Sequence, residues 1–389
     1  MLSFRRSSAE RKTIVLHVGF HKTATTSLQQ FLAGNARYLA KRGVLYPKAG
    51  RSDGTTHGLL ANLLKPENNR AVEGKQCWAS LEAELAKFSG DTAILSSECF
   101  LESRKMPPVL AGLCENYDVR VVMYLRRQDQ WIQSVYNEVV ADSMRRHVGG
   151  VKDLREYRQG WLEYEKILAQ WQAPFRSCDL VVRPFERSQF VGGDIRADFV
   201  EALGLTKRLQ DIDFHAGQEQ ANPSMPPELV EFLRRCNLLP MTYDAHRSLV
   251  GELRQLGLNW KKSKLPTNAW ISQSDAVELM QRFKQCNAHL GQQYRGQARS
   301  FFEERWPEAG SQALDEELLT PSLQHHIFDS LSQDCQNRLA QASPAIKNRV
   351  STKAFLNKPA VDDATRLRQI INRQRHELRM LYRQTGEME

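Results

Sequence analysis

The chain has 389 residues, 41% hydrophobic and 25% charged, which is enough apolar material for a full core and a small additional domain. No stretch approaches the length of a membrane span, and the basic residues 1–12 do not precede an apolar run of signal-peptide length. The net charge of +9 suits either an anionic ligand or a solvated basic surface, and no nucleic-acid-binding module is recognisable. We therefore expect a soluble globular protein without a transmembrane segment and without a nucleic-acid partner.

The seven cysteines are scattered along the chain and form no C-x-x-C pair. Their odd number and wide spacing argue against a disulfide framework and against a zinc site. Unpaired thiols are typical of a reducing compartment. The cysteines therefore favour a cytoplasmic protein with no metal site.

The stretch Thr13–Gln30 predicts a strand, a short polar loop and a helix. A buried-strand run begins at Ile14 and ends before Gly19, and apolar residues with helical spacing begin at Leu28. Such a loop directs backbone N–H groups and the positive end of the helix dipole at one point. The residues that would surround this point are Lys22, Thr23, Ala24, Thr25, Thr26 and Ser27. The stretch predicts a site for a phosphate-type anion, with an ordinary strand-to-helix turn as the alternative.

The spacing of this loop distinguishes it from an ATP-binding loop. A Walker A loop has a glycine directly before its lysine, whereas Phe20 and His21 separate Gly19 from Lys22. The stretch instead resembles the 5′-phosphosulfate loop of sulfotransferases, which use 3′-phosphoadenosine 5′-phosphosulfate (PAPS) and usually carry K-x-G-T-T after a short strand. Ala24 stands where that family usually has glycine, so the question is whether the backbone has a positive φ there.

A second segment supports the same resemblance. A buried strand ends at Leu125, Arg126 follows it, and Ser134 lies eight residues later on an expected helix. This pair resembles the 3′-phosphate-binding element of sulfotransferases, because a guanidinium takes two phosphate oxygens and a hydroxyl supplies a third contact. Arg127 is the fallback for Arg126. Gln128 replaces the proline usual in the family, and R-R-Q-x-x-W is similar to bacterial sulfotransferase-like proteins.

Two residues are candidates for a catalytic base. His57 lies at an expected loop-to-helix junction, and histidine is well matched to accept a proton near neutral pH. Glu98 ends the expected strand of residues 92–98, at the edge of a parallel sheet where ligands gather. A surface histidine and a plain charged strand end are the alternatives, and the sequence does not choose between the two bases.

The resemblance implies sulfuryl transfer from PAPS to an acceptor hydroxyl or amine, leaving adenosine 3′,5′-bisphosphate. Lys22 would stabilise the oxygen that bridges sulfur and phosphorus, and no metal would be required. A carbohydrate or glycan is the expected acceptor, by analogy with the bacterial proteins. A nucleotide-dependent kinase or NTPase with Glu98 on magnesium, and a non-catalytic relative, are the alternative functions.

The expected fold is α/β, with three α/β/α layers around a central parallel sheet and a mainly helical C-terminal region. Further strands are expected at residues 43–47 and 179–186, and one apolar helix face from Tyr157 to Trp171. The expected division is a sulfotransferase domain at 1–295 and a helical extension at 296–389. Two basic features have no assigned function: the lysines of residues 261–264, and a helix at residues 361–384 with a leucine and isoleucine stripe and many arginines.

Overall fold

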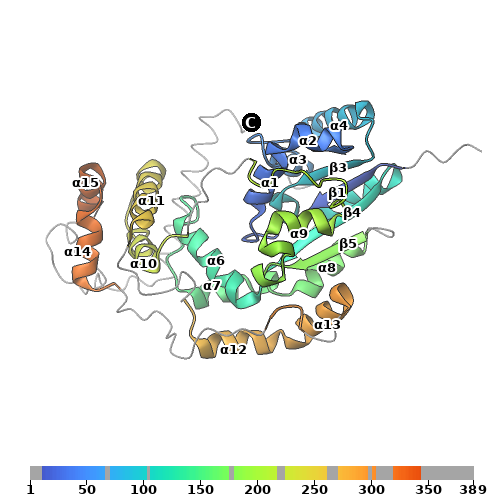
Figure 1. Ribbon diagram of the computed structural model, residues 1–389. Coiled ribbons are helices and arrows are strands. Elements are labelled where there is room, and N and C mark those ends of the chain that lie inside the picture. The colour runs from blue at the N-terminus through green and yellow to red at the C-terminus, as the bar shows by residue number, and fades with distance from the viewer. Residues whose placement is uncertain are drawn as a thin grey trace, which may run out of the picture. The chain divides into compact units, whose positions relative to one another are not determined.

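The computed structural model describes residues 11–65, 71–102, 106–174, 179–216, 224–260, 270–296, 300–303 and 319–342 (Figure 1). The lysines of residues 261–264 and the expected helix at 361–384 lie outside these residues. Within the described residues, no helix combines the length and the apolar character needed to cross a membrane.

The chain forms two compact units that interleave along the sequence. Unit 1 comprises residues 1–135, 155–222 and 273–310, and unit 2 comprises residues 136–154, 223–272 and 311–389. The expected division at residue 295 is a cut along the sequence, and these units partition the chain in a different way. Each unit is described separately below.

Unit 1 is built on a five-stranded parallel sheet. Its strands, in the spatial order β2-β3-β1-β4-β5, are β2 Val44–Leu45, β3 Thr92–Ser96, β1 Thr13–His17, β4 Asp118–Leu125 and β5 Asp179–Pro184. All five strands were expected from short apolar runs, and the α/β fold with a central parallel sheet is confirmed. Ser96 and Val122 are the Cα partners of His17, so β1 and β3 end together while β4 continues to Leu125.

Helices flank both faces of this sheet (Figure 1). On one face, Val15, Ile94 and Val122 are buried against the first helix and against Phe199. Alternate strand residues point to opposite faces, and Ile14 is also completely buried, so both faces are covered. The α-helices of unit 1 are α1 Thr25–Gly34, α2 Ala36–Lys41, α3 Gly58–Leu64, α4 Ala71–Lys87, α5 Met106–Ala111, α8 Tyr164–Gln172, α9 Ile195–Ala202, α12 Gln273–Arg282 and α13 Lys284–Arg295.

Short 3-10 helices and two shared helices complete the assignment. The 3-10 helices are η1 Glu98–Phe100, η2 Gly112–Glu115, η3 Gln159–Trp161, η4 Arg187–Gln189 and η5 Val191–Gly193. The helices that run from one unit into the other are α6 Gln128–Ala141 and α7 Val151–Tyr157. The expectation of one apolar helix face from Tyr157 to Trp171 was wrong, because η3 interrupts the segment and Tyr157 is 81% exposed.

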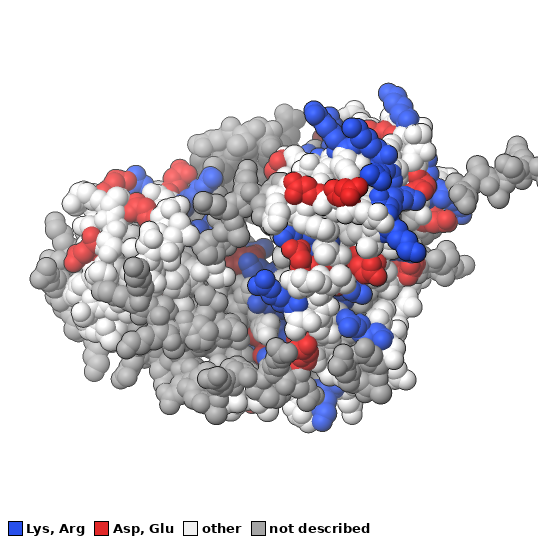
Figure 2. Space-filling view, in the orientation of Figure 1, with Lys and Arg blue, Asp and Glu red and all other residues white. Residues whose placement is uncertain are grey.

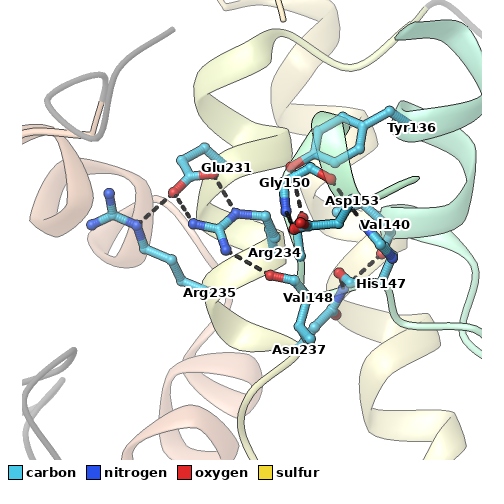
Figure 3. Close-up of polar contacts among 11 residues, drawn as sticks. Tyr136, Val140, His147, Val148, Gly150, Asp153, Glu231, Arg234, Arg235 and Asn237 are labelled. Carbon is cyan, nitrogen blue, oxygen red and sulfur yellow. Dashed lines mark hydrogen bonds and ion pairs between the residues drawn. The ribbon is translucent and has the colours of Figure 1, made fainter. Parts of the chain in front are cut away.

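Unit 2 is helical, as expected for the C-terminal part of the chain. Its helices are α10 Pro227–Cys236, α11 Tyr243–Leu258, α14 Pro321–Asp329 and α15 Gln333–Ala342. Glu231 on α10 accepts hydrogen bonds from Arg234 and Arg235, and Arg234 also donates to the carbonyl of Val148 (Figure 3). This buried ion-pair group fixes the segment before α7 against α10.

Asn237 makes a second connection in unit 2. Its amide nitrogen donates to the carbonyls of Val140 and His147, at 2.9 and 3.0 Å (Figure 3). Its Oδ1 therefore accepts from Nε2 of His246, at 2.7 Å, and Nδ1 of His246 in turn accepts from the Ser143 hydroxyl. The network is closed and buried, which is typical of a structural role.

The charged side chains on the visible face of unit 1 are of both signs. In Figure 2, Lys and Arg side chains gather along the upper right of this unit, with Asp and Glu side chains among them.

Candidate anion-binding site

The loop between β1 and α1 is held by side chains that bind its carbonyl groups. The three carbonyls of Phe20–Lys22 accept, in order, from Thr23 Oγ1 at 2.6 Å, Trp131 Nε1 at 3.0 Å and Arg126 Nη1 at 3.2 Å. The C=O and N–H of a trans peptide point in opposite directions, so the N–H groups of these peptides point away from the side chains that hold them. The loop is thus fixed through three successive carbonyl groups.

The N–H groups that follow have no internal acceptor. In the described residues, no main-chain carbonyl accepts from the N–H groups of residues 23–27, and the first helical bond runs from Leu28 N to Ala24 O at 3.2 Å. No side chain caps the N-terminus of α1. Exposed N–H groups at the positive end of a helix dipole are typical of a phosphate or sulfate site.

Ala24 has a left-handed backbone conformation, which glycine adopts more easily than alanine. Its φ is 55° and its ψ 31°, and Lys22 also has a positive φ, of 67°. The left-handed region costs an L-residue about 1–2 kcal/mol, so the contacts that hold the loop offset this strain. The loop conformation expected from the resemblance is therefore present without its glycine.

We predict that Ala24→Gly raises the unfolding free energy by up to about 1 kcal/mol, because glycine adopts this φ without strain. The greater freedom of glycine in the unfolded chain offsets part of the gain. The measurement is urea denaturation, with Ala33→Gly in α1 as the matched control, which should destabilise the protein by about 1 kcal/mol. Equal destabilisation by both variants would contradict the strain at Ala24.

Glu98 lies directly against this loop. Its Oε1 accepts from Thr25 Oγ1 at 2.6 Å, and its Oε2 accepts from Gln29 Nε2 at 2.8 Å. Burial alone would raise the pKa of the Glu98 carboxyl, but the hydrogen bonds from Thr25 and Gln29 lower it below its ordinary value. Glu98 is therefore ionised at neutral pH, which is the state that a base requires.

His57 is placed very differently. It is completely buried, its Nδ1 accepts from the main-chain N–H of Ser96 at 3.1 Å, and its Nε2 donates to the carbonyl of Pro47 at 3.0 Å. Burial lowers the pKa of His57 to about 3, and nearby Arg51 contributes to this shift. Both ring nitrogens are occupied by backbone groups, so the geometry favours a structural role for His57 and leaves Glu98 as the better base.

We predict that His57 contributes to acid sensitivity. Its folded pKa of about 3 lies below its ordinary value of 6.5, so it stabilises the fold above pH 6.5 and this contribution is lost as the pH falls. In His57→Gln, the loss of unfolding free energy between pH 7 and pH 5 should be about 2 kcal/mol smaller. Urea denaturation at both pH values tests this, with exposed His289→Gln as the control. An unchanged pH dependence in His57→Gln would contradict it.

The second anion element brings Arg126 to the loop. In addition to its bond to Lys22 O, its Nε is buried without a hydrogen-bond partner in the described residues, and its guanidinium lies 5.6 Å from the centre of the Phe185 ring. Burial lowers the pKa of Arg126. A buried guanidinium N–H without an acceptor suits an anionic ligand at this position.

Arg127 and Ser134 have other surroundings. Arg127 is 4% exposed and forms a two-point ion pair with Asp129, at 2.6 and 2.7 Å. The Arg127 guanidinium is therefore engaged in a structural ion pair. Ser134 is half-buried in α6, and no hydrogen bond joins it to the loop in the described residues. Arg126 is therefore better placed than Arg127 to bind an anionic ligand.

The remaining loop residues divide by exposure. Thr23 is completely buried, and its hydroxyl donates to the carbonyl of Phe20, so Thr23 stabilises the conformation of the loop. The Thr25 hydroxyl is used by Glu98, whereas Thr26 is exposed and Ser27 half-buried. Thr26 and Ser27 thus have the hydroxyls best placed for a ligand.

Sequence reasoning missed the part played by two aromatic residues. The sequence indicates Trp131 only as the last residue of R-R-Q-x-x-W, but its indole N–H donates to the carbonyl of His21. Its ring also stacks on Trp161, with centroids 6.4 Å apart. A tryptophan one turn into the helix that follows the arginine is the available sequence signal, because a buried indole N–H needs an acceptor.

Comparisons with known proteins give little functional information. No model of a protein family matches the chain, and no solved structure matches it. A protein of Archaeoglobus fulgidus, described as an uncharacterized protein, is 25% identical over 213 residues, which is 54% of this chain and 55% of the relative. The chain thus spans about half the length of that relative, and the function must be argued from the site.

Proposed function

We propose that the protein is a sulfotransferase that transfers the sulfuryl group of PAPS to a hydroxyl, or an amine, of a carbohydrate. The observation that carries this proposal is the binding of three successive loop carbonyls by side chains, the last of them Arg126. Arg126 thereby lies against the loop that carries Lys22, although the two residues come from distant segments of the chain. A donor with phosphates at both its 5′ and 3′ positions would bind the loop through one phosphate and Arg126 through the other.

The residues fit the two ends of such a donor. The N–H groups of residues 23–27, with the hydroxyls of Thr26 and Ser27, would hold the 5′-phosphosulfate. Arg126 would hold the 3′-phosphate through the N–H groups that its loop contact does not use, with Ser134 as an additional donor. We also propose a cytoplasmic location, on the basis of the unpaired cysteines.

The chemistry needs a base and a stabilised leaving oxygen. Glu98 accepts the proton of the acceptor hydroxyl as that oxygen forms a bond to sulfur. The bond between sulfur and the bridging oxygen breaks, and Lys22 neutralises the negative charge that develops on that oxygen. The sulfuryl group carries less charge than a phosphoryl group, so this reaction does not require the magnesium clamp of kinases.

Calorimetry with three nucleotides tests this proposal. Adenosine 3′,5′-bisphosphate should bind at least about tenfold more tightly than adenosine 5′-monophosphate, because hydrogen bonds to a charged 3′-phosphate contribute about 1.5–3 kcal/mol. ATP should bind weakly, with or without EDTA. Tight ATP binding that EDTA weakens would identify a kinase or NTPase, and absence of binding by all three would overturn the proposal.

A further inference from the structure

A cleft of about 370 Å³ lies in unit 1, between the segment that follows β3 and the segment η3–α8. Its volume is near the lower end of the range for small-molecule sites, about 300–1,000 Å³. The lining includes Leu101, Glu102, Trp161, Glu163, Lys166 and Trp171. The cleft has the size for a small ligand or the end of a chain.

The cleft adjoins the groups proposed to react. The His21 ring lies 5.6 Å from the Trp161 ring, and its Nε2 is 3.9 Å from Glu102 Oε1. His21 directly precedes Lys22, and Glu102 is the fourth residue after Glu98. His21, the neighbour of Lys22 in the chain, therefore contacts two residues that line the cleft.

The charges of the cleft are balanced. Glu102 pairs with Lys65, at 2.6 Å, and Glu163 pairs with Lys166, at 2.8 Å. Each of these carboxylates thus has its own cation, although the chain as a whole has a net charge of +9. Such paired groups still offer hydrogen-bond acceptors and donors, but they provide little net attraction for an anion.

An aromatic surface completes the cleft. Trp161 is half-buried and lines the cleft, so its ring presents apolar area beside the carboxylates, whereas Trp171 lies almost fully buried behind the lining. A sugar ring offers the matching surfaces, because its C–H groups pack on an aromatic ring while its hydroxyls bond to carboxylates. An acidic polymer would instead require unpaired cations.

We infer that this cleft binds the acceptor, and that the acceptor is a neutral sugar and not an acidic one. The inference rests on the proposed function, since it takes the cleft as the second substrate site of that reaction. It assigns Trp161 to packing on the sugar ring and Glu102 to bonding its hydroxyls.

Saturation-transfer NMR with two defined probes, cellobiose and glucuronic acid, tests the inference. Cellobiose should bind more tightly than glucuronic acid, and Trp161→Ala should raise its dissociation constant at least tenfold. Tyr157→Ala, which removes an exposed aromatic side chain from the same segment, is the control and should change the dissociation constant of cellobiose less than twofold. Undetectable cellobiose binding, or equal binding by Trp161→Ala and the wild type, would overturn the assignment of the cleft.

A second variant tests the charge argument without removing a large side chain. Glu102→Gln leaves Lys65 without its carboxylate, so the ratio of glucuronic acid binding to cellobiose binding should rise severalfold. An unchanged ratio, or a wild-type preference for glucuronic acid, would contradict the neutral acceptor.

Adenosine 3′,5′-bisphosphate binding on the same samples separates this inference from the proposed function. Sugar binding without nucleotide binding would refute the sulfotransferase proposal and retain a sugar-binding cleft. Nucleotide binding without sugar binding would refute the cleft assignment alone.

Discussion

Replacing Lys22 with alanine should reduce the turnover of PAPS by at least about a hundredfold. Removal of a single preorganised donor from the position where charge develops typically lowers turnover by about 10²–10³. The amine acts on the transition state, so the affinity for adenosine 3′,5′-bisphosphate should change much less than turnover does. The fold should be retained, because the side chains of Thr23, Trp131 and Arg126 hold the loop through its carbonyls.

The measurement is release of adenosine 3′,5′-bisphosphate from PAPS, with water or a neutral sugar as the acceptor. Lys41→Ala, at the exposed end of α2, is the matched control and should retain full turnover. Near-normal turnover in Lys22→Ala would remove the proposed mechanism, whatever the nucleotide affinity.

The second large effect is expected for Arg126→Ala, in donor binding. Loss of its hydrogen bonds to a charged 3′-phosphate should weaken adenosine 3′,5′-bisphosphate binding by about 10- to 100-fold. Adenosine 5′-monophosphate has no 3′-phosphate, so its affinity should fall only through the lost bond to Lys22 O. The ratio of the two affinities, measured by calorimetry, should therefore approach one.

Arg127→Ala is the control for Arg126→Ala. It breaks a buried ion pair with Asp129, which should cost about 3–5 kcal/mol of unfolding free energy. It should not reduce the preference for the 3′-phosphate. The opposite pattern, with Arg127→Ala removing that preference and Arg126→Ala retaining it, would reassign the 3′ site.

Local patterns were sufficient to predict the sheet and the loop. A run of apolar residues such as Val121–Leu125 is buried on both faces only in a parallel sheet, and the polar residues after each strand then lie at one edge. This reasoning placed Glu98 at the end of the sheet where the loop lies, and the structure joins it to Thr25 by a hydrogen bond. The spacing of apolar and polar residues within each segment was therefore enough to predict the strands and the edge at which Glu98 lies.

Contacts between distant segments were not predictable in this way. Trp131 holds a carbonyl 110 residues earlier in the chain, and no periodicity indicates which acceptor an indole finds. His57 was expected at an accessible junction, but its bonds to Ser96 and Pro47 depend on how the chain returns over the sheet. Tyr157 fitted the spacing of one helix, but the structure ends α7 at this residue and forms η3 before α8 begins.

The bound carbonyls of Phe20–Lys22 make the loop rigid, although the N–H groups that follow them make no main-chain hydrogen bond in the described residues. Rigid backbone is normally protected from amide hydrogen exchange because its N–H groups are bonded, yet here the N–H groups of residues 23–27 have no main-chain acceptor in the described residues. These amides should exchange quickly in the free protein and slow sharply when an anion binds, with little change in the amides around them. Such a local change would report a ligand that enters a site already formed, so association should be fast and little conformational entropy should be lost.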